Sequence, residues 1–561
     1  MREEKQARVG QGWCVPGRCR AFLLLLGILS LYIGTTTLSS RHTSATFDEI
    51  LLSSAGARGY VTGDFDLVKY YHPRVMPYLY GLPVVASGPK YPDEARFTGD
   101  RFAFNYAQEL FWEGGSDPEK LIFRTRLVGV ATGAFLVFLV FLFGYRFYGP
   151  AAAVASAGMM AFLPDLLAHG GIAYNDVAAA LTIFGAVWCL DRACRQPSVG
   201  TISLASLAVA LALGVKYSAL VLGPIGFLLV GVEAISRKGE WQRYLWSLLP
   251  FAYLSLGVLY LATVAIYLGD LTLASFRTGL VFSLQQVGQG QPASPWLLGE
   301  SYSGGTWKYF PLAFLIKVPV ALQALLLLGL IGLLLRPSAR RNWLESPLRG
   351  PIVATAVLIP VLITSQLNIG FRHALPLLPF LIVIASAGLQ RLWETRRPMI
   401  QGLVTALLAV QALSVLSWYP HFIPYTSEYF PGKDSGHLLL TDSNHDWGQG
   451  LLVLRDFMEE EGIPTVYLSY FGSAWPEAYG IGHVPLPSFF PLPDQPWPES
   501  PPEYVVVSAT NVVGGYVDGR FRELLLVPPE EVLAHTLFVY RSEDVLALGV
   551  ELPDAEMAEG T

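Results

Sequence analysis

The stretch Leu127–Tyr148 reads LVGVATGAFLVFLVFLFGYRFY, and no charged residue interrupts it before Arg146. An α-helix rises about 1.5 Å per residue, so about 20 apolar residues cross the roughly 30 Å hydrocarbon core of a bilayer. One residue later a second apolar run begins, Pro150–Leu167. These two runs predict consecutive membrane-spanning helices and therefore a membrane protein.

The composition agrees with this prediction. Of the 561 residues, 52% are hydrophobic and 15% are charged, whereas a soluble domain carries about 25% charged residues. A chain this apolar cannot cover its surface with polar groups, so lipid must solvate much of it. The formal net charge of -6 gives no reason to expect a nucleic-acid partner.

About eleven spans are expected in all. The run Ile202–Ile235 is too long for one span, and Gly214-Val215-Lys216 interrupts it near the middle, so it predicts two spans joined by a turn. The remaining candidates are Ala21–Ser40, Ile172–Leu190, Tyr244–Leu268, Phe310–Leu335, Pro351–Thr364, Ala374–Leu389 and Met399–Trp418.

Lysine and arginine in short loops predict the orientation, because they concentrate on the cytoplasmic side. Under the eleven-span arrangement the basic loops all fall on one side. They are the basic N-terminus, Arg192/Arg195, Arg237/Lys238/Arg243, Arg336/Arg340/Arg341/Arg349 and Arg391/Arg396/Arg397. We therefore expect a multi-pass protein of the plasma (inner) membrane with a cytoplasmic N-terminus and an extracytoplasmic C-terminus.

This topology divides the chain into a cytoplasmic segment 1–20, a transmembrane part 21–418 and an extracytoplasmic domain 419–561. Two outer loops, 41–120 and 269–309, are long enough to cover the membrane part. The C-terminal segment contains 22 acidic and 5 basic residues, which suits a translocated, soluble domain.

The C-terminal segment alternates strand-like and helix-like runs and predicts a small α/β domain. The expected helix is Gly450–Glu461, and the expected strands are His437–Leu440, Thr465–Tyr470, Tyr504–Val507 and Leu537–Tyr540. Between the first strand and the helix lies Leu440–Gln449, LTDSNHDWGQ, whose polar residues favour a tight turn before a helix start. The predicted fold class is thus an α-helical polytopic membrane protein with a small C-terminal α/β domain.

Candidate chemistry begins at Thr46-Phe47-Asp48-Glu49, just beyond the first span on the outer side. Two adjacent carboxylates near the membrane surface suit a general base or a metal ligand. The same residues also suit the first turn of a helix, where acids are stabilised. Position alone leaves both interpretations open, and it leaves Glu49 as a rival to Asp48.

Several cations are assigned to the same outer face. His72 and Arg74 stand beside prolines in the first outer loop, Lys216 lies in the turn between two spans, and Arg372 precedes a further span. Three separate cationic positions on one face favour an anion site. Anchoring by an aromatic belt with a snorkelling arginine is the alternative for His72 and Arg74.

A polar segment between the third and fourth spans adds further candidates: His169, Tyr174, Asn175 and Asp176. Asp176 suits a helix cap, yet an acid entering an apolar run is expensive unless it faces a polar cavity. Acids and cations meeting on the outer face fit glycosyl transfer from a phosphate leaving group. A carboxylate takes the acceptor's proton, and cations stabilise the departing phosphate.

Five motifs together resemble the GT-C superfamily of membrane glycosyltransferases. Within it they are most similar to the branch of dolichyl-phosphate-mannose protein mannosyltransferases and bacterial aminoarabinose transferases. The resemblance spans about residues 20–400. The motifs are Phe47-Asp48-Glu49, His72-Pro73, the Ala168-His169-Gly170…Tyr174-Asn175-Asp176 run, the Gly214-x-Lys216-Tyr217-Ser218 turn and Phe371-Arg372-His373-x-x-Pro376-x-x-Pro379.

The resemblance implies an inverting transferase with Asp48 as catalytic base and Asp176 lining the site. It implies that Lys216 and Arg372, joined by His72 and Arg74, bind the carrier phosphate. His169, Tyr174, Asn175 and His373 would line the substrate site. The aminoarabinose enzymes have Lys-Pro-Pro where this chain has His72-Pro73-Arg74, so the sugar stays open.

The partners implied are a polyprenyl-phosphate-linked sugar, membrane lipid and a glycan, lipid or protein acceptor. No cofactor is assigned, and a divalent metal stays open: metal-dependent relatives carry Asp-x-Asp signatures, whereas Asp48 and Glu49 are adjacent here. Two other functions are retained, namely a transporter or flippase of polyprenyl-linked sugars and a membrane-anchored binding module. A transporter would favour polar broken helices at the bilayer midplane and inverted repeats.

Overall fold

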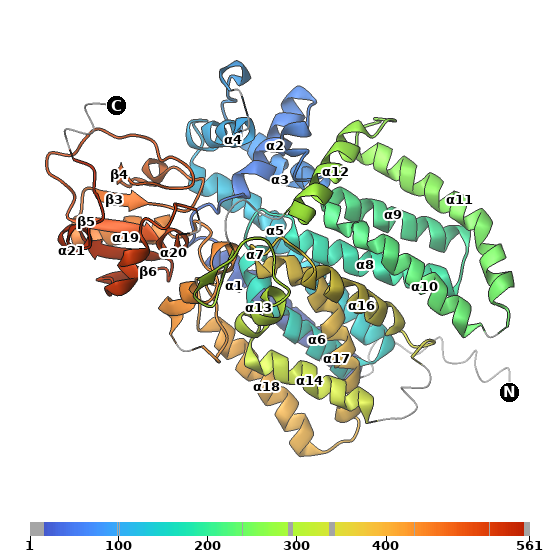
Figure 1. The fold of residues 1–561 in the computed structure, drawn as a ribbon. Coiled ribbons are helices and arrows are strands. Elements are labelled where there is room, and N and C mark those ends of the chain that lie inside the picture. Colours follow the sequence, from blue (N-terminus) through green and yellow to red (C-terminus); the bar gives the residue numbers. More distant parts are fainter. Residues whose placement is uncertain are drawn as a thin grey trace.

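The structure is a computed structural model, and the residues it describes are 16–97, 99, 101–237, 239–289, 295–335, 343–430, 432–514 and 516–554. Most of the predicted cytoplasmic segment 1–20 lies outside them. Figure 1 shows a bundle of long helices with a small sheet-containing unit on one side. The sheet lies beside the helices of the first outer loop, near α4 (Phe102–Trp112).

Every one of the eleven predicted spans is helical. Seven helices are long and apolar enough to cross a membrane: α1 (Pro16–Ser39), α5 (Pro118–Phe147), α8 (Asp176–Arg195), α10 (Leu222–Ser236) with its preceding 3₁₀ turn η3 (Tyr217–Val221), α11 (Trp241–Ile266), α17 (Leu378–Trp393) with η4 (Phe371–Leu377), and α18 (Pro398–Leu416). This count covers the described ranges. The chain is therefore a multi-pass membrane protein.

The other four predicted spans deviate from one straight helix. Two are bent pairs: α6 (Pro150–Ala161) with α7 (Pro164–Gly170) at 62°, and α13 (Tyr309–Lys317) with α14 (Val320–Leu334) at 110°. Two are shorter apolar helices, α9 (Val199–Val215) and α16 (Arg349–Ile363). The predicted break at Lys216 is present, since the residue is extended there (φ -152°) and ends α9.

Small residues allow the helices to approach closely. A Cβ atom added at Gly388 of α17 would lie 1.8 Å from the carbonyl oxygen of Gly329 on α14. A larger residue at either position would force the two backbones apart. Close packing of small residues replaces the hydrophobic driving force that is missing between helices in lipid.

The two loops predicted to lie outside, 41–120 and 269–309, both contain helices. The first carries α2 (Glu49–Thr62), η1 (Asp66–Val68), α3 (Val75–Ser87), η2 (Glu94–Arg96) and α4. The second carries α12 (Ala274–Gln289) and a two-stranded hairpin of β1 (Trp296–Leu297) and β2 (Glu300–Ser301).

The C-terminal unit contains a five-stranded mixed sheet in the order β4-β3-β5-β7-β6. Its elements are α19 (Leu451–Glu461), β3 (Val466–Ser469), β4 (His483–Pro485), β5 (Tyr504–Ser508), α20 (Ala509–Val513), β6 (Glu531–Leu533), β7 (Leu537–Arg541) and α21 (Ser542–Ala547). β3 pairs in parallel with β4 and β5, while β7 pairs antiparallel with β5 and β6. Residues of β3 and most of β5 are buried.

Three of the four predicted strands are confirmed as β3, β5 and β7, and the predicted helix is α19. The strand predicted at His437–Leu440 is wrong. His437 and Leu438 end a 3₁₀ helix, η5 (Lys433–Leu438), and Leu440 makes one isolated bridge to Leu297. Leu440 is buried there instead of joining the five-stranded sheet, while Leu438 is exposed.

Candidate active site

Asp48 and Glu49 are neighbours in sequence but have different surroundings. Glu49 accepts two hydrogen bonds of 2.8 Å from Arg126 of α5, one from Nε and one from Nη2. Its carboxylate also accepts from the backbone N–H groups of Thr46 and Ala173, at 3.1 and 2.9 Å. With 1% of its side chain exposed, Glu49 is an enclosed ion pair that fixes the start of α2 against α5. The first-turn interpretation thus fits Glu49.

Asp48 occupies the N-cap position of α2 but makes no side-chain capping hydrogen bond. Its Oδ2 lies 3.8 Å from Nη2 of Arg372, and 21% of its side chain is exposed. Withdrawal from solvent raises the pKa of Asp48 to about 6, against the opposing attraction of Arg372. A partly exposed carboxylate that is not used for helix capping, with a pKa near neutrality, suits proton transfer.

Asp176 and Lys216 form the second part of the site. Asp176 is the first residue of α8, and its Oδ1 accepts a short hydrogen bond from Nζ of Lys216. Its Oδ2 lies 3.6 Å from Nη1 of Arg372. Arg372 therefore stands between the two carboxylates of Asp48 and Asp176, within ion-pair distance of both.

Two aromatic rings enclose the guanidinium of Arg372. Its central carbon lies 4.1 Å from the ring centroid of Trp447 and 5.0 Å from that of Tyr174. The two rings meet edge to face at 5.4 Å. Contacts with ring faces stabilise the guanidinium without occupying its N–H groups.

The remaining predicted lining residues also lie here, with one change of role. The Nδ2 atom of Asn175 is 3.2 Å from Nδ1 of His72 and donates to the carbonyl of Val215 at 3.1 Å. The rings of His72 and Tyr174 meet at 5.3 Å. Burial, reinforced by Lys216, lowers the pKa of His72 to about 3. Burial therefore favours the neutral imidazole here, which suits its contact with Asn175, and phosphate binding by His72 stays a prediction.

Arg74 lies apart from this cluster. Its guanidinium pairs with Asp66, with Nε at 3.0 Å, and covers the ring of Tyr267 at 4.8 Å. The arginine is thus neutralised within the outer loop, and the expectation that it binds the carrier phosphate is not supported by its position.

Buried polar atoms without a hydrogen-bond partner gather in this cluster. Among the described residues they include Asp176 Oδ2, Arg372 Nε and Nη1, Asn175 Oδ1, His169 Nδ1 and His373 Nε2. Buried polar groups in native proteins are nearly always satisfied, and the exceptions concentrate where a ligand or water completes them. This concentration makes the cluster a candidate binding site for a polar ligand.

No group of three or more His, Cys, Asp or Glu side chains is arranged to hold a metal ion, as far as the described residues extend. The cluster instead combines two carboxylates with two cations. The residues present therefore do not fit a metal centre, and no step below involves one.

Sequence reasoning missed two residues of the C-terminal segment. Trp447 covers Arg372, as described above. Asp442 accepts a short hydrogen bond from the Tyr516 hydroxyl, and its charge acts on both Asp48 and Arg372. Burial raises the pKa of Asp442. Both residues belong to the motif LTDSNHDWGQ (440–449), which the sequence analysis interpreted only as a turn before a helix.

The segment 442–449 joins the two sides of the site. The backbone N–H of Phe47 donates to the carbonyl of Trp447 at 2.9 Å, next to Asp48. On the other side, the N–H of Phe371 donates to Oδ1 of Asn444 at 2.7 Å, and Oγ of Ser443 donates to the carbonyl of Ile369 at 2.8 Å. The motif thus fixes the distance between the loop of Asp48 and the loop of Arg372.

Residues 24–269 match the family model of dolichyl-phosphate-mannose-protein mannosyltransferases, which confirms the resemblance seen in the motifs. The matched range contains Asp48, Asp176 and Lys216, and Arg372 lies beyond it. The chain is thus a polytopic membrane protein in which residues 24–269 are similar to that family. No curated protein matches the chain.

Three similar solved structures share the fold only distantly. ArnT from Cupriavidus metallidurans in the apo state is 16% identical, with a TM-score of 0.47, covering 71% of this chain and 65% of that one. ArnT bound to undecaprenyl phosphate is 14% identical, with a TM-score of 0.44 and coverages of 70% and 64%. The Archaeoglobus fulgidus oligosaccharyltransferase tethered with an acceptor peptide is 12% identical, with a TM-score of 0.39 and coverages of 82% and 63%. The chain spans less than two thirds of each of them.

Proposed function

We propose that the protein is an inverting glycosyltransferase that moves a sugar from a polyprenyl-phosphate carrier to an acceptor at the outer face of the membrane. The observation that carries the proposal is the arrangement around Arg372. One carboxylate, Asp48, makes no capping hydrogen bond to its own helix, and it faces a cation whose Nε and Nη1 are without hydrogen-bond partners. The mannosyltransferase-family match over residues 24–269 supports the same reaction class.

The proposed reaction is a single displacement. The acceptor hydroxyl forms a bond to the anomeric carbon while the bond from that carbon to the phosphate oxygen breaks. The hydroxyl proton passes to Asp48, and the electron pair leaves with the phosphate. The phosphate gains one negative charge as Asp48 loses one, so the net charge of the site is unchanged. Inversion follows because no covalent sugar–enzyme intermediate forms.

Arg372 and Lys216 supply the charge for the departing phosphate. The guanidinium of Arg372 has Nε and Nη1 unbonded, and charge-assisted hydrogen bonds from arginine to phosphate are among the strongest in proteins. Lys216 is held by Asp176 at the end of α9. Preorganised cations stabilise charge that develops in the transition state without reorganising at that moment.

The orientation forms part of the proposal. The distribution of basic loops favours a cytoplasmic N-terminus and an extracytoplasmic C-terminal domain. The site lies at the outer end of the bundle, where the lipid tail of the donor holds its phosphate at headgroup depth. The acceptor then arrives from the aqueous side, beneath the outer loops and the C-terminal domain.

The broken helices are better explained by this enzyme than by a transporter. Transporters direct broken-helix ends at substrate near the bilayer midplane. At the α13–α14 break, Lys317 donates instead to the carbonyls of Ile423, Tyr425 and Asn444, at 2.7, 2.9 and 2.7 Å. This break therefore holds the C-terminal segment over the bundle.

A transfer assay with an Asp48 variant tests the proposal. Purified protein in nanodiscs would be supplied with radiolabelled polyprenyl-phosphate monosaccharides, and the release of polyprenyl phosphate would be measured. Asp48→Asn keeps the size of the side chain but cannot take the proton, so turnover should fall by about 10²–10⁴-fold while donor binding persists. Glu113→Gln, at an exposed carboxylate of the same outer loop, is the matched control. Full turnover by Asp48→Asn would refute the assignment of the base.

A further inference from the structure

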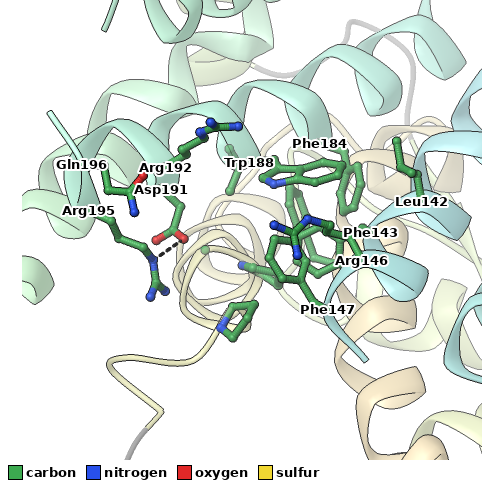
Figure 2. A pocket seen from close by; sticks show the side chains of 15 residues that line it. Leu142, Phe143, Arg146, Phe147, Phe184, Trp188, Asp191, Arg192, Arg195 and Gln196 are labelled. Carbon is green, nitrogen blue, oxygen red and sulfur yellow. Dashed lines mark hydrogen bonds and ion pairs between the residues drawn. The ribbon is translucent and has the colours of Figure 1, made fainter. Parts of the chain in front are cut away.

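A second charged cavity lies at the other end of α8, away from Asp176. Figure 2 shows it between the C-terminal ends of α5 and α8, with Arg146, Arg192 and Arg195 around it. Its volume is about 430 Å³. Because α8 has 20 residues, this cavity lies roughly 30 Å from the candidate active site. It is therefore a separate site.

The charge of this cavity is not balanced. Its one lining carboxylate, Asp191, is paired with Nε of Arg195 at 2.8 Å and with Nε of Arg349 at 2.6 Å. Arg146 and Arg192 are exposed, and neither forms an ion pair within the part of the chain that the structure describes. The lining thus carries two arginines whose charge no neighbouring carboxylate neutralises.

The wall beside these arginines is aromatic. Phe143 meets Trp188 at 5.2 Å and Phe184 at 5.6 Å, both edge to face, and all three line the cavity. Figure 2 shows these rings on the side of Arg146. A cationic rim next to an apolar wall at the end of membrane helices matches a lipid, whose charged headgroup adjoins its hydrocarbon chains.

We propose that this cavity binds the headgroup of an anionic phospholipid, with Arg146 and Arg192 on the phosphate and the first carbons of an acyl chain along the aromatic wall. Net negative charge is required because Asp191 is already paired twice and leaves no carboxylate for the ammonium of a zwitterionic headgroup. In the proposed orientation the lipid belongs to the cytoplasmic leaflet. Basic pockets between membrane helices on this side are suited to anionic headgroups.

A structural explanation competes with this proposal. Arg146 and Arg192 stand in the last turns of α5 and α8, where basic residues interact favourably with the helix dipole. That explanation predicts no preference among lipids. It also does not explain why aromatic side chains line a cavity between the two helix ends.

Lipid binding by delipidated, purified full-length protein distinguishes the two explanations. Dioleoylphosphatidylglycerol and dioleoylphosphatidylcholine would be titrated separately and the bound lipid counted by native mass spectrometry. The wild type should bind the anionic lipid more tightly, and Arg146→Gln/Arg192→Gln should bind it about 30-fold more weakly. Arg243→Gln/Arg397→Gln, which removes two exposed arginines outside the cavity, is the matched control.

The proposal is overturned by any of three outcomes: equal affinity of the wild type for the two lipids, unchanged affinity of the cavity variant, or an equal loss in the control. Because Arg146 and Arg192 are exposed, their replacement should leave thermal unfolding unchanged, and a shift in unfolding would be checked with Arg192→Gln alone.

Discussion

The two ends of α8 each hold a buried cluster of acids and cations, and the clusters differ in how completely they are bonded. At the C-terminal end of α8, which the basic loops predict to be the inner end, Arg349 pairs with both Asp191 and Glu233. Arg195 and Arg237 pair with the same two carboxylates at 2.8 Å. At the outer end, Arg372 stands 3.6 and 3.8 Å from its two acids with Nε and Nη1 unbonded.

This difference separates charges that hold the fold from charges available for chemistry. A buried ion pair is tolerated when hydrogen bonds satisfy both partners, and then removing one partner is costly. Open pairs such as those of Arg372 contribute less to the fold and leave donors for a ligand. The same contrast separates Glu49, which Arg126 encloses, from Asp48, which the proposed reaction uses.

The largest effect is expected at the inner end. Arg349→Met would leave Asp191 and Glu233 with less compensation in a buried setting, so the free energy of unfolding should fall by about 3–5 kcal/mol. Transfer per folded molecule should stay near the wild-type value. Detergent-solubilised unfolding curves and a transfer assay on the surviving folded fraction measure the two quantities. A variant that keeps its stability but loses transfer activity would contradict the structural role assigned to Arg349.

Arg372→Met should weaken donor binding more than it lowers the stability of the fold, the reverse of Arg349→Met. The affinity for a polyprenyl-phosphate donor should drop by roughly 10- to 100-fold, because a charge-assisted hydrogen bond contributes about 1.5–3 kcal/mol. Thermal unfolding should change less than in Arg349→Met. Donor titration by native mass spectrometry gives the affinity. Unaltered donor binding would mean that the phosphate is held elsewhere.

The pH profile tests the free carboxylate of Asp48. Its pKa is raised to about 6 mainly by burial, and the base acts only when deprotonated. The transfer rate should therefore be level above about pH 7 and fall roughly tenfold per pH unit well below 6. Donor binding should not fall in parallel, since protonation of Asp48 frees Arg372 for the phosphate. A rate that is flat from pH 8 to pH 4.5 would contradict this role.

A smaller effect is expected at Trp447, which covers Arg372 at 4.1 Å. Trp447→Leu should weaken donor binding by about 2- to 30-fold, the range of a cation–π contact, and Trp447→Phe should restore part of it by returning a ring face. Donor titration of the two variants checks this order. If the Phe and Leu variants bound the donor with equal affinity, Trp447 would contribute only packing, without a cation–π contact to the guanidinium.

The sequence predicted the helical part of the fold well, because apolar length is a local property. All eleven predicted spans are helical, including the break at Lys216, although α9 and α16 are shorter than a full span. The strand predicted at His437–Leu440 is absent because His437 and Leu438 end a 3₁₀ helix and Leu440 pairs with Leu297 instead of the sheet. Which surface an apolar run covers depends on tertiary contacts that no window of sequence contains.

The site was predicted unevenly for a similar reason. Asp48, Asp176, Lys216 and Arg372 were recognised by type and by the face assigned to them, and the structure brings them together. Arg74 was grouped with them because sequence does not show that Asp66, eight residues earlier, neutralises it. Trp447 was missed because its contact with Arg372 joins positions 75 residues apart.

The most direct test of the account is a cryo-electron microscopy map of the protein in nanodiscs with added polyprenyl phosphate. The account predicts phosphate density within hydrogen-bonding distance of both the Arg372 guanidinium and the Lys216 ammonium, with Asp48 on the side from which the acceptor approaches. Phosphate density that touches neither cation, or that lies only in the cavity of Arg146 and Arg192, would contradict it.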